Sequence, residues 1–244
     1  VWSGKNWGYD GAPYPGEDPV PAGLDWKLWL GTASDRPFVA GKYHPGQWRR
    51  MIDFGCGTLG DMGVHIFDTP FRALELTAPS WVETSCRPPT AFGHPERNTV
   101  RYGFGATART TPEFTFTWYD GQGAPASGEP DLDLPGGEKL PSQGAMFVGE
   151  DGRMLLPHTA GPRFYPKELT QKLTKPDLKP VNHYHQFVDA ILGTTETTAH
   201  FDYAAPLTET LLLGVVAARF PGRKLTWDPR AMKITNLPEA HAFL

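Results

Sequence analysis

The chain has 244 residues, with an apolar fraction of 39%, a charged fraction of 20% and a formal net charge of −4. This composition excludes an intrinsically disordered chain, and the length is sufficient to bury a sizeable core. No basic stripe is present and the longest apolar run is too short to span a bilayer, so neither nucleic acid nor a membrane is an expected partner. Cys56 and Cys86 are able to pair, which leaves the redox compartment open.

The first 50 residues are rich in aromatic side chains and show neither a helical nor a strand period. The rings stand among glycines and prolines, and rings of this size need a surface on which to pack. We therefore expect residues 1–50 to form an extended loop packed on the rest of the chain. Residues 51–244 are expected to form the substrate-binding and catalytic domain. Such a loop acts as a strap, carries function, or does both.

Residues 57–76 change to a helical pattern. Met62 and Ile66 fall on one side of this helix, and polar residues recur at three-to-four spacing on another. Thr69-Pro70 predicts a kink or the start of a second short helix, because proline is tolerated best in a first turn.

The middle of the chain predicts strands, because its apolar runs are β-branched and aromatic. Asp120-Gly121 and Asp151-Gly152 are turn dipeptides typical of hairpins. The polar stretch between the two hairpins is expected to be an exposed loop. The expected strands are residues 81–85, 99–104, 113–119, 145–148 and 153–156.

Two helices are expected near the end of the chain. Asn182 caps the first, which has one apolar face and ends at Gly193. Pro206 opens the second, residues 207–220, which is apolar nearly all round and is therefore expected to be buried. A short strand at 224–227 precedes an irregular tail. Strands grouped between helices predict an α+β fold with an open, largely antiparallel sheet flanked by helices.

Residues 55–60 match the G-x-G-x-x-G pattern of dinucleotide-binding loops. That pattern functions only after a buried strand, which aims the helix N–H groups at a pyrophosphate. Residues 48–54 do not read as a buried strand, so we interpret the glycines as an entry into a helix that lies close to a ligand. No cofactor-binding residue is predicted within the chain. Acyl and phosphoryl transfer have no supporting motif either.

Asp61 and His65 are four residues apart, so on a helix they share one face with their side chains about 5–6 Å apart. A carboxylate beside an imidazole orients the ring, which suits proton transfer to and from a hydroxyl near neutral pH. Gly60 and Gly63 would keep this face clear for a substrate. Two other interpretations stay open: a solvated polar face, and a metal site that includes Asp68. No partner cluster completes a metal site, and no metal is expected.

Four further residues are candidate substrate contacts. His44 and the pair Trp48-Arg49 are able to bind sugar hydroxyls, with the Trp48 ring stacking on a sugar face. His183 and His185 stand two residues apart at a helix start and diverge, so joint metal binding is poor. His183 is expected to face the substrate cleft. The alternative for each of these residues is simple exposure to solvent.

Residues 60–68, which read GDMGVHIFD, resemble the Gfo/Idh/MocA family of glucose–fructose oxidoreductase and inositol dehydrogenase. The likeness is to the bacterial subgroup of oxidoreductases with an α/β C-terminal domain. Together the matching stretches are specific, although the middle strands fit only in outline. The other matching stretches are 24–31 (LDWKLWLG), 43–45 (YHP), Trp48-Arg49, 201–209 (FDYAAPLTE) and 225–228 (LTWD).

The resemblance implies a two-domain enzyme in which an N-terminal Rossmann domain binds NAD or NADP and supplies a lysine from a Glu-Lys-Pro motif. The C-terminal domain, of the dihydrodipicolinate-reductase-like type, supplies the substrate pocket. By this analogy the chain is the substrate-binding and catalytic half of a sugar or polyol dehydrogenase. His65 would be the acid/base that takes the proton of the substrate hydroxyl, and Asp61 would fix the sugar and the imidazole.

The chain itself contains no Rossmann domain and no Glu-Lys-Pro motif. We therefore expect a Rossmann domain elsewhere in a longer polypeptide or in a partner chain, and no redox activity from this chain alone. A homo-oligomer is expected through the sheet face that carries Phe114, Phe116 and Trp118, unless these rings pack under the helices. The bacterial cytoplasm and periplasm both remain open. Two alternative functions are a cofactor-free carbohydrate-binding module and a keto-sugar lyase or hydratase in which His65 acts alone.

Overall fold

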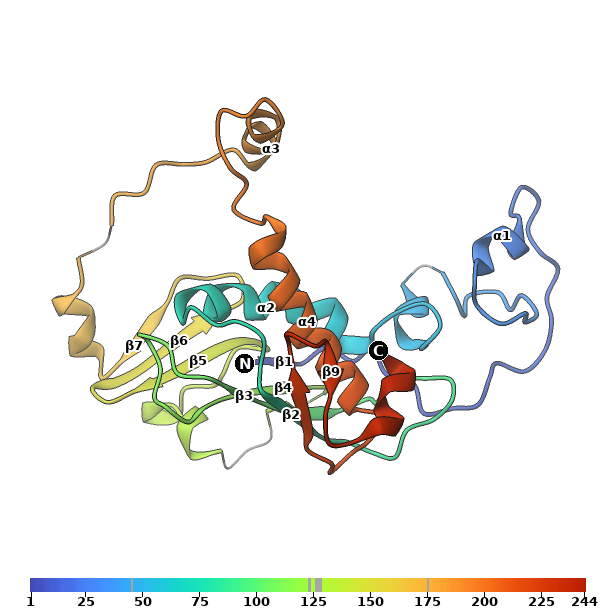
Figure 1. The fold of residues 1–244 in the computed structure, drawn as a ribbon, viewed down its shortest axis with the longest axis horizontal. Coiled ribbons are helices and arrows are strands. Elements are labelled where there is room, and N and C mark those ends of the chain that lie inside the picture. The colour runs from blue at the N-terminus through green and yellow to red at the C-terminus, as the bar shows by residue number, and fades with distance from the viewer. Residues whose placement is uncertain (45, 123, 126–128, 175) are drawn as a thin grey trace.

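The computed structural model describes residues 1–44, 46–122, 124–125, 129–174 and 176–244. Pro45, part of the Tyr-His-Pro motif that supports the family resemblance, lies outside these residues. Across the described part, helices lie over one face of an open sheet (Figure 1). No helix in that part is long and apolar enough to cross a membrane.

Within the described residues, the sheet has nine strands in the order β7-β6-β5-β1-β4-β3-β2-β8-β9. Every pairing between neighbouring strands is antiparallel except β1 with β4, which is parallel. The predicted α+β fold with an open, largely antiparallel sheet is therefore confirmed. The strands are β1 (Trp2–Ser3), β2 (Trp81–Ser85), β3 (Asn98–Phe104), β4 (Phe114–Asp120), β5 (Gln143–Gly149), β6 (Gly152–Pro157), β7 (Arg163–Tyr165), β8 (Leu225–Asp228) and β9 (Lys233–Ile234).

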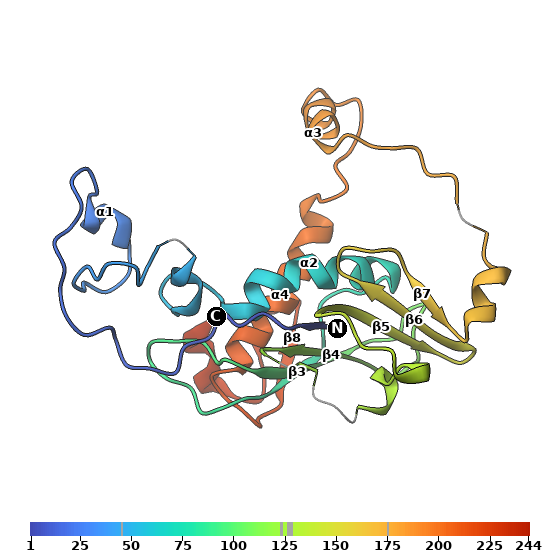
Figure 2. The same cartoon turned by 180° about the vertical axis from the view of Figure 1, so that it is seen from behind.

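Four α-helices accompany the sheet within the described residues, together with short 3-10 turns. The helices are α1 (Trp26–Leu30), α2 (Gly57–Ala73), α3 (His183–Ile191) and α4 (Phe201–Ala217). The 3-10 turns are η1 (Gln47–Arg50), η2 (Pro130–Leu132), η3 (Pro135–Gly137), η4 (Lys167–Lys172) and η5 (Pro238–Phe243). Of these helices, α2 and α4 pack against each other over the sheet (Figures 1 and 2).

Both long helices differ from the predicted ones at a proline. Pro70 lies inside α2, and no second helix begins there. Pro70 and Phe71 are both buried, so packing on the sheet outweighs the lost backbone hydrogen bond. The helix α4 begins at Phe201 rather than at residue 207, with Pro206 inside it. Its first turn is attached to α2, because the Tyr203 hydroxyl donates to the main-chain oxygen of Asp68 at 2.8 Å.

The main core lies between α2, α4 and the sheet. The Phe67 ring of α2 is 4.6 Å from the Phe116 ring and 5.4 Å from the Trp118 ring of β4, measured between centroids. Both rings are therefore buried under α2, which is the alternative stated above, and they do not form an exposed surface. The homo-oligomer stays a prediction. The strand alternation was correct, but it does not reveal whether helices cover the apolar face.

Most of the aromatic residues between positions 9 and 54 form a small core of their own. Val39, Tyr43 and Met51 are buried there with Phe92, which comes from the loop between β2 and β3. The stacked rings of Trp26 and Trp29, 4.8 Å apart, belong to α1 and pack against this cluster. This segment, which we call the aromatic lobe (residues 9–54), extends to one side of the sheet in Figure 1. The division of the chain at residue 50 stays a prediction.

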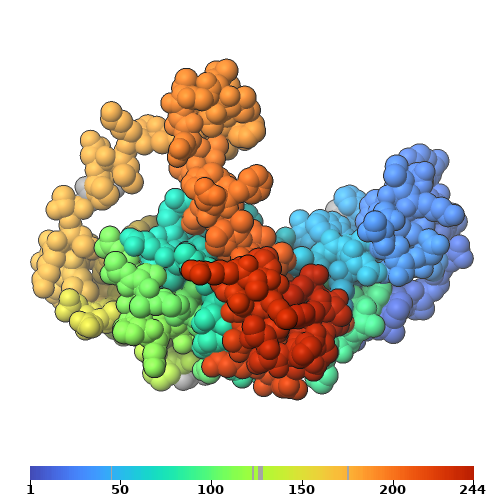
Figure 3. Space-filling view, viewed as in Figure 1, coloured from blue at the N-terminus to red at the C-terminus, as the bar shows by residue number. Residues whose placement is uncertain are grey.

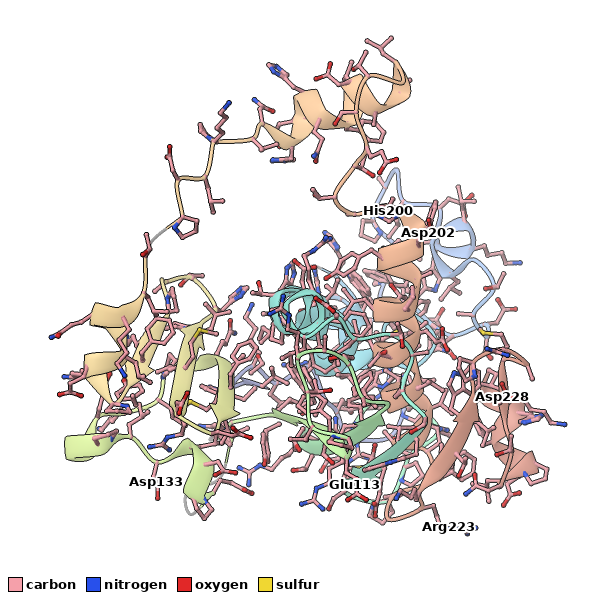
Figure 4. All side chains as sticks on the ribbon, turned by 60° about the vertical axis from the view of Figure 1, so that its left-hand side comes forward. Glu113, Asp133, His200, Asp202, Arg223 and Asp228 are labelled. Atoms are coloured by element: carbon pink, nitrogen blue, oxygen red, sulfur yellow. The ribbon has the colours of Figure 1, made fainter. Side chains whose placement is uncertain are left out.

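Helix α3 stands apart from the body of the protein, between two extended segments (Figures 1 and 3). Asn182 caps it as predicted, accepting from the main-chain N–H groups of Tyr184 and His185. None of its residues is buried, and Phe187 and Ile191 are 61% and 70% exposed. Its side chains project into solvent around the whole helix (Figure 4).

Candidate functional site

Helix α2 carries Asp61 and His65 on the side that faces away from the core. Met62, Gly63 and Ile66 are buried on the opposite side, so the sheet fixes the rotation of the helix. Asp61 is half-buried and His65 is exposed, one helical turn further along. The structure therefore places both residues where a bound molecule can reach them.

Arg49 is the partner of Asp61. The Arg49 Nε atom donates to Asp61 Oδ1 at 2.7 Å, and the side chains are 31% and 25% exposed. The guanidinium also lies 4.6 Å from the centroid of the Trp48 ring and 5.5 Å from that of the Trp7 ring. The 3-10 turn η1 thus brings Trp48 and Arg49 against α2, although they are more than ten residues away from Asp61 in the sequence. We call Trp7, Trp48, Arg49 and Asp61 the Arg49 cluster.

Trp7 is a member of this cluster that the sequence did not single out. Its main-chain N–H donates to the Thr58 hydroxyl at 2.7 Å, which attaches it to the first turn of α2. Its indole N–H is buried and has no hydrogen-bond partner among the described residues. Nothing in the local pattern separates Trp7 from the other rings of the segment, because the contact joins residues 51 positions apart.

His65 has a second histidine beside it. The ring of His158, which follows β6, lies 5.9 Å from the His65 ring between centroids, too far for a direct hydrogen bond between them. A small pocket of about 100 Å³ lies between the two rings and the sheet. Its lining is His65, Ile66, Thr69, Ala145, Leu156, Pro157, His158 and Ala160. His158 was missed because it is distant in sequence and stands in no motif.

The glycines of the G-x-G-x-x-G segment contact protein rather than open space. A Cβ at Gly55 would lie 2.7 Å from Arg49 Cα, and a Cβ at Gly57 would lie 2.8 Å from His94 Cβ. The His94 ring also bonds through Nε2 to the carbonyl oxygen of Gly55 at 2.7 Å, and burial lowers the pKa of this histidine. The residues directly before the segment form the 3-10 turn η1 (Gln47–Arg50) and not a strand, as predicted. The segment therefore does not fit a dinucleotide phosphate.

Gly63 does not keep the face of α2 clear for a substrate, so that part of the prediction was wrong, whereas the role given to Gly60 stays a prediction. A Cβ at Gly63 would lie 2.5 Å from Leu211 Cδ2 of α4, and a Cβ at Gly60 would lie 2.2 Å from Cys56 Cβ. Gly63 is needed for the close contact of two helices, which the polar pattern of α2 does not reveal.

The structure does not gather all the predicted substrate contacts at one place. His44 is exposed in the turn that precedes η1, close in sequence to the Arg49 cluster. His183 is exposed on α3, with its ring 4.1 Å from that of Tyr184. Figure 1 shows α3 well separated from α2. Among the described residues, no group of three or more histidine, cysteine or acidic side chains is placed to hold a metal ion.

The matches of the chain with known proteins differ in weight. No curated protein matches the chain significantly. A solved NAD-binding protein from Listeria innocua is 15% identical with a TM-score of 0.49, over 75% of this chain and 55% of that one. The chain thus spans about half the length of that protein, and a likeness of this size carries no argument. Residues 2–107 match the family model described as oxidoreductase family, C-terminal α/β domain. These residues include the GDMGVHIFD segment, so this part of the chain is similar to the C-terminal domain of that oxidoreductase family.

Proposed function

We propose that the chain supplies the substrate side of an oxidoreductase that uses NAD or NADP to oxidise a CH–OH group of a sugar or polyol. The observation that supports this proposal best is the outward face of α2, where His65 stands one turn from Asp61 and Asp61 is held by Arg49. An imidazole and a set of fixed polar groups on one rigid helix suit the binding and deprotonation of a hydroxyl.

The charges of this face favour a neutral polyhydroxyl substrate. Arg49 and Asp61 compensate each other, so the cluster offers donors and acceptors without a net charge. The Trp48 ring supplies a flat apolar surface beside them, of the kind that packs on the C–H groups of a sugar ring. In this proposal His65 takes the proton of the hydroxyl that is oxidised, while Asp61 and Arg49 bind neighbouring hydroxyls.

The nicotinamide cofactor would be held mainly by a Rossmann domain, in the same polypeptide or in a partner chain. The glycine segment at the start of α2 packs on Arg49 and His94 and does not offer a phosphate cradle. The described residues of this chain bind and orient the substrate in this proposal, and the redox step needs the second domain.

The test is the oxidation rate of the assembled two-domain protein, followed by the absorbance of NADH or NADPH over a panel of sugars and polyols. His65→Asn is expected to lower kcat by about 10²–10⁴-fold, because the proton acceptor is removed. The matched control is His185→Asn, since His185 is exposed on α3. Equal rates for His65→Asn and the control would contradict the proposed role of His65.

A second candidate is a carbohydrate-binding module without redox chemistry. The observation that favours it is that Trp7, Trp48, Arg49 and Asp61 all come from this chain and need no second domain. Calorimetry of the isolated chain with the same panel of sugars separates the two candidates. Sugar binding that NAD(P) and the second domain leave unchanged, with no turnover in the assembled protein, would support the module.

A further inference from the structure

The two histidines beside the small pocket come from different elements of the fold. His65 projects from α2, and His158 directly follows the end of β6. The His158 N–H donates to the carbonyl oxygen of Gln143 on β5 at 3.1 Å, so the sheet fixes the backbone on that side of the pocket. Helix α2 passes over β5 and contacts it (Figure 2). The packing of α2 on the sheet therefore sets both backbone positions.

Neither imidazole is occupied by a structural contact. The rings of His94 and His241 each bond to a main-chain oxygen at 2.7 Å. Among the described residues, neither the His65 ring nor the His158 ring makes such a bond, and both residues are exposed. The hydroxyl of Thr69, one turn beyond His65 on α2, has no partner among these residues either. All three polar groups are therefore available to a bound molecule.

The distance between the two rings suits one shared oxygen atom. The ring centroids are 5.9 Å apart and the ring planes are tilted by 56°. Hydrogen bonds of about 2.8 Å from one nitrogen of each ring to the same oxygen allow the centroids to lie up to about 8 Å apart. A hydroxyl has one proton to donate and lone pairs to accept, and a neutral imidazole has one N–H and one accepting nitrogen. A single hydroxyl is therefore able to donate to one ring and accept from the other.

The space beside the rings is small and has a partly apolar lining. Its volume is about 100 Å³. A water molecule takes about 30 Å³ in the liquid, so roughly three groups of that size fit. Ala145 of β5 and Leu156 of β6, which lie directly opposite each other, line it together with Pro157. A terminal glycol group, –CHOH–CH2OH, suits this volume, whereas a complete sugar ring with its hydroxyls is too large to enter.

The pocket also lies in line with the Arg49 cluster. Asp61, His65 and Thr69 follow one another at four-residue spacing, so they share one side of α2 and are about 6 Å apart along the helix. None of the described residues that line the pocket is an aspartate, glutamate, lysine or arginine. The lining therefore favours a neutral group over a carboxylate or a phosphate, and a molecule that extends from the pocket meets His65 first and Asp61 next.

We propose that this pocket is a subsite for the terminal glycol group of an open-chain polyol. One hydroxyl of the glycol lies between the His65 and His158 rings, the second bonds to the Thr69 hydroxyl, and the carbon atoms pack on the apolar lining. His158 is thus a substrate contact, and the remaining carbons extend toward the Arg49 cluster. This inference rests on the proposed function, in which His65 binds a substrate hydroxyl, and it narrows the substrate class to open-chain polyols.

The test compares D-sorbitol with myo-inositol, which have equal numbers of carbons and hydroxyls. Only sorbitol has a terminal glycol group. The ring signals of His65 and His158 are followed by NMR while the chain is titrated with each compound. Sorbitol is expected to shift both signals with one common dissociation constant, and myo-inositol to shift neither at the same concentrations. A sorbitol effect on one ring alone or on neither ring, or an equal effect of myo-inositol, would overturn the subsite.

Two substitutions each remove one of the proposed hydrogen bonds. His158→Gln and Thr69→Val roughly keep the size of the side chain, and each is expected to raise the dissociation constant for sorbitol about fivefold, as for one lost hydrogen bond. The matched controls are His185→Gln and Thr195→Val, because both residues are exposed and lie outside the pocket. Dissociation constants that are unchanged in both test variants would overturn the subsite as well.

These measurements separate the subsite from the proposed function. If sorbitol binds at both rings and the assembled two-domain protein oxidises no polyol or sugar, the subsite is supported and the proposed function is contradicted. If oxidation depends on His65 and sorbitol leaves the His158 signal unchanged, the proposed function is supported and the subsite is overturned.

Discussion

At the residue scale, Asp120 is a carboxyl group buried at the end of β4. Its Oδ1 atom accepts from the Asn98 N–H at 2.9 Å, and its Oδ2 atom accepts from the Trp118 indole at 2.8 Å. Burial raises the pKa of Asp120 to about 6, and these hydrogen bonds offset only part of that effect. The neutral form is therefore favoured in the folded protein compared with the unfolded chain.

This shift predicts a loss of stability between about pH 4 and pH 6. Below its ordinary value of 3.8 the carboxyl is protonated in both states, and above about 6 it is ionised in both. Between these values the folded state binds more protons, so the free energy of unfolding falls as the pH rises, by about 3 kcal/mol at most. Urea unfolding of the wild type and of Asp120→Asn at pH 4 and pH 7 measures this change in the free energy of unfolding.

The free energy of unfolding of the wild type, relative to that of Asp120→Asn, is expected to be lower at pH 7 than at pH 4, because asparagine does not titrate. Asp133→Asn serves as the control, since Asp133 is exposed (Figure 4). A difference that is the same at both pH values would show that Asp120 has an ordinary pKa.

A substitution of Arg49 is expected to weaken substrate binding with little effect on the stability of the fold. Arg49→Lys keeps the charge but loses the planar stack on Trp48 and Trp7. Under the proposed function, we expect KM of the assembled two-domain protein for its sugar or polyol to rise about tenfold. The free energy of unfolding is expected to change by less than about 1 kcal/mol, as for other partly exposed ion pairs. Arg109→Lys, which alters the exposed pair with Glu75, is expected to leave KM unchanged.

Single residues also show how much of the candidate site could be predicted from the sequence. Helical spacing was enough to place Asp61 and His65 on one face, because a helix fixes the geometry of residues four apart. It could not reveal that Arg49 binds Asp61, or that His158 lies beside His65. Those contacts depend on how loops return to the helix, and no periodicity encodes that return.

At the scale of elements, α2 and α4 are held close by two glycines. Gly63 faces Leu211, and Gly214 of α4 faces Leu59 and the Tyr102 hydroxyl, which a Cβ at Gly214 would approach to 2.1 Å. Interiors packed to this density leave no room for an added methyl group. The distance between the two helices is therefore set by the absence of side chains at these positions.

Gly63→Ala and Gly214→Ala are each expected to lower the free energy of unfolding by about 1–3 kcal/mol, because the added methyl group meets neighbours closer than 3 Å. The sign is informative, since alanine in an uncrowded helix would stabilise by roughly 1 kcal/mol. Gly105→Ala is the control, because a Cβ there meets no atom within 4 Å. Chemical denaturation measures all three, and stabilisation by Gly63→Ala would contradict the packing argument.

The longer strands were predictable as elements, and β2 was predicted at its observed residues. Runs of β-branched and aromatic residues are long enough there to show their period. Strands β1 and β9 have two residues and β7 has three, so they carry no period at all and were missed. The start of α4 was placed too late because proline suggested a first turn, whereas Tyr203 and its contact with α2 set the true start.

At the scale of the whole molecule, the grouping of strands and helices along the sequence was enough to predict the α+β class. It did not predict that the aromatic lobe would form its own small core, or that α3 would stand away from the body. Both features depend on which surfaces meet in space. The apolar side chains Phe187, Val188 and Ile191 of α3 therefore remain exposed in the structure of this chain.

The isolation of α3 predicts low local stability. A helix of nine residues, none of them buried, is marginal in water, whereas α4 is buried against the sheet. In hydrogen exchange of the isolated chain, the amides of α3 are expected to exchange at least about 100-fold faster than those of α4. Equal protection of the two helices would show that another surface covers α3 in solution.

The two-residue strand β1 also has a consequence for the order of folding. Its partners lie more than 110 positions later in the chain, whereas the hairpins β3–β4 and β5–β6 join neighbouring segments. Closing the long loops to Trp2 and Ser3 costs more entropy than forming either hairpin, so the hairpins are expected to form first. During synthesis, Trp2 and Ser3 would then leave the ribosome before both hairpins but pair after them, and would join two preformed parts of the sheet.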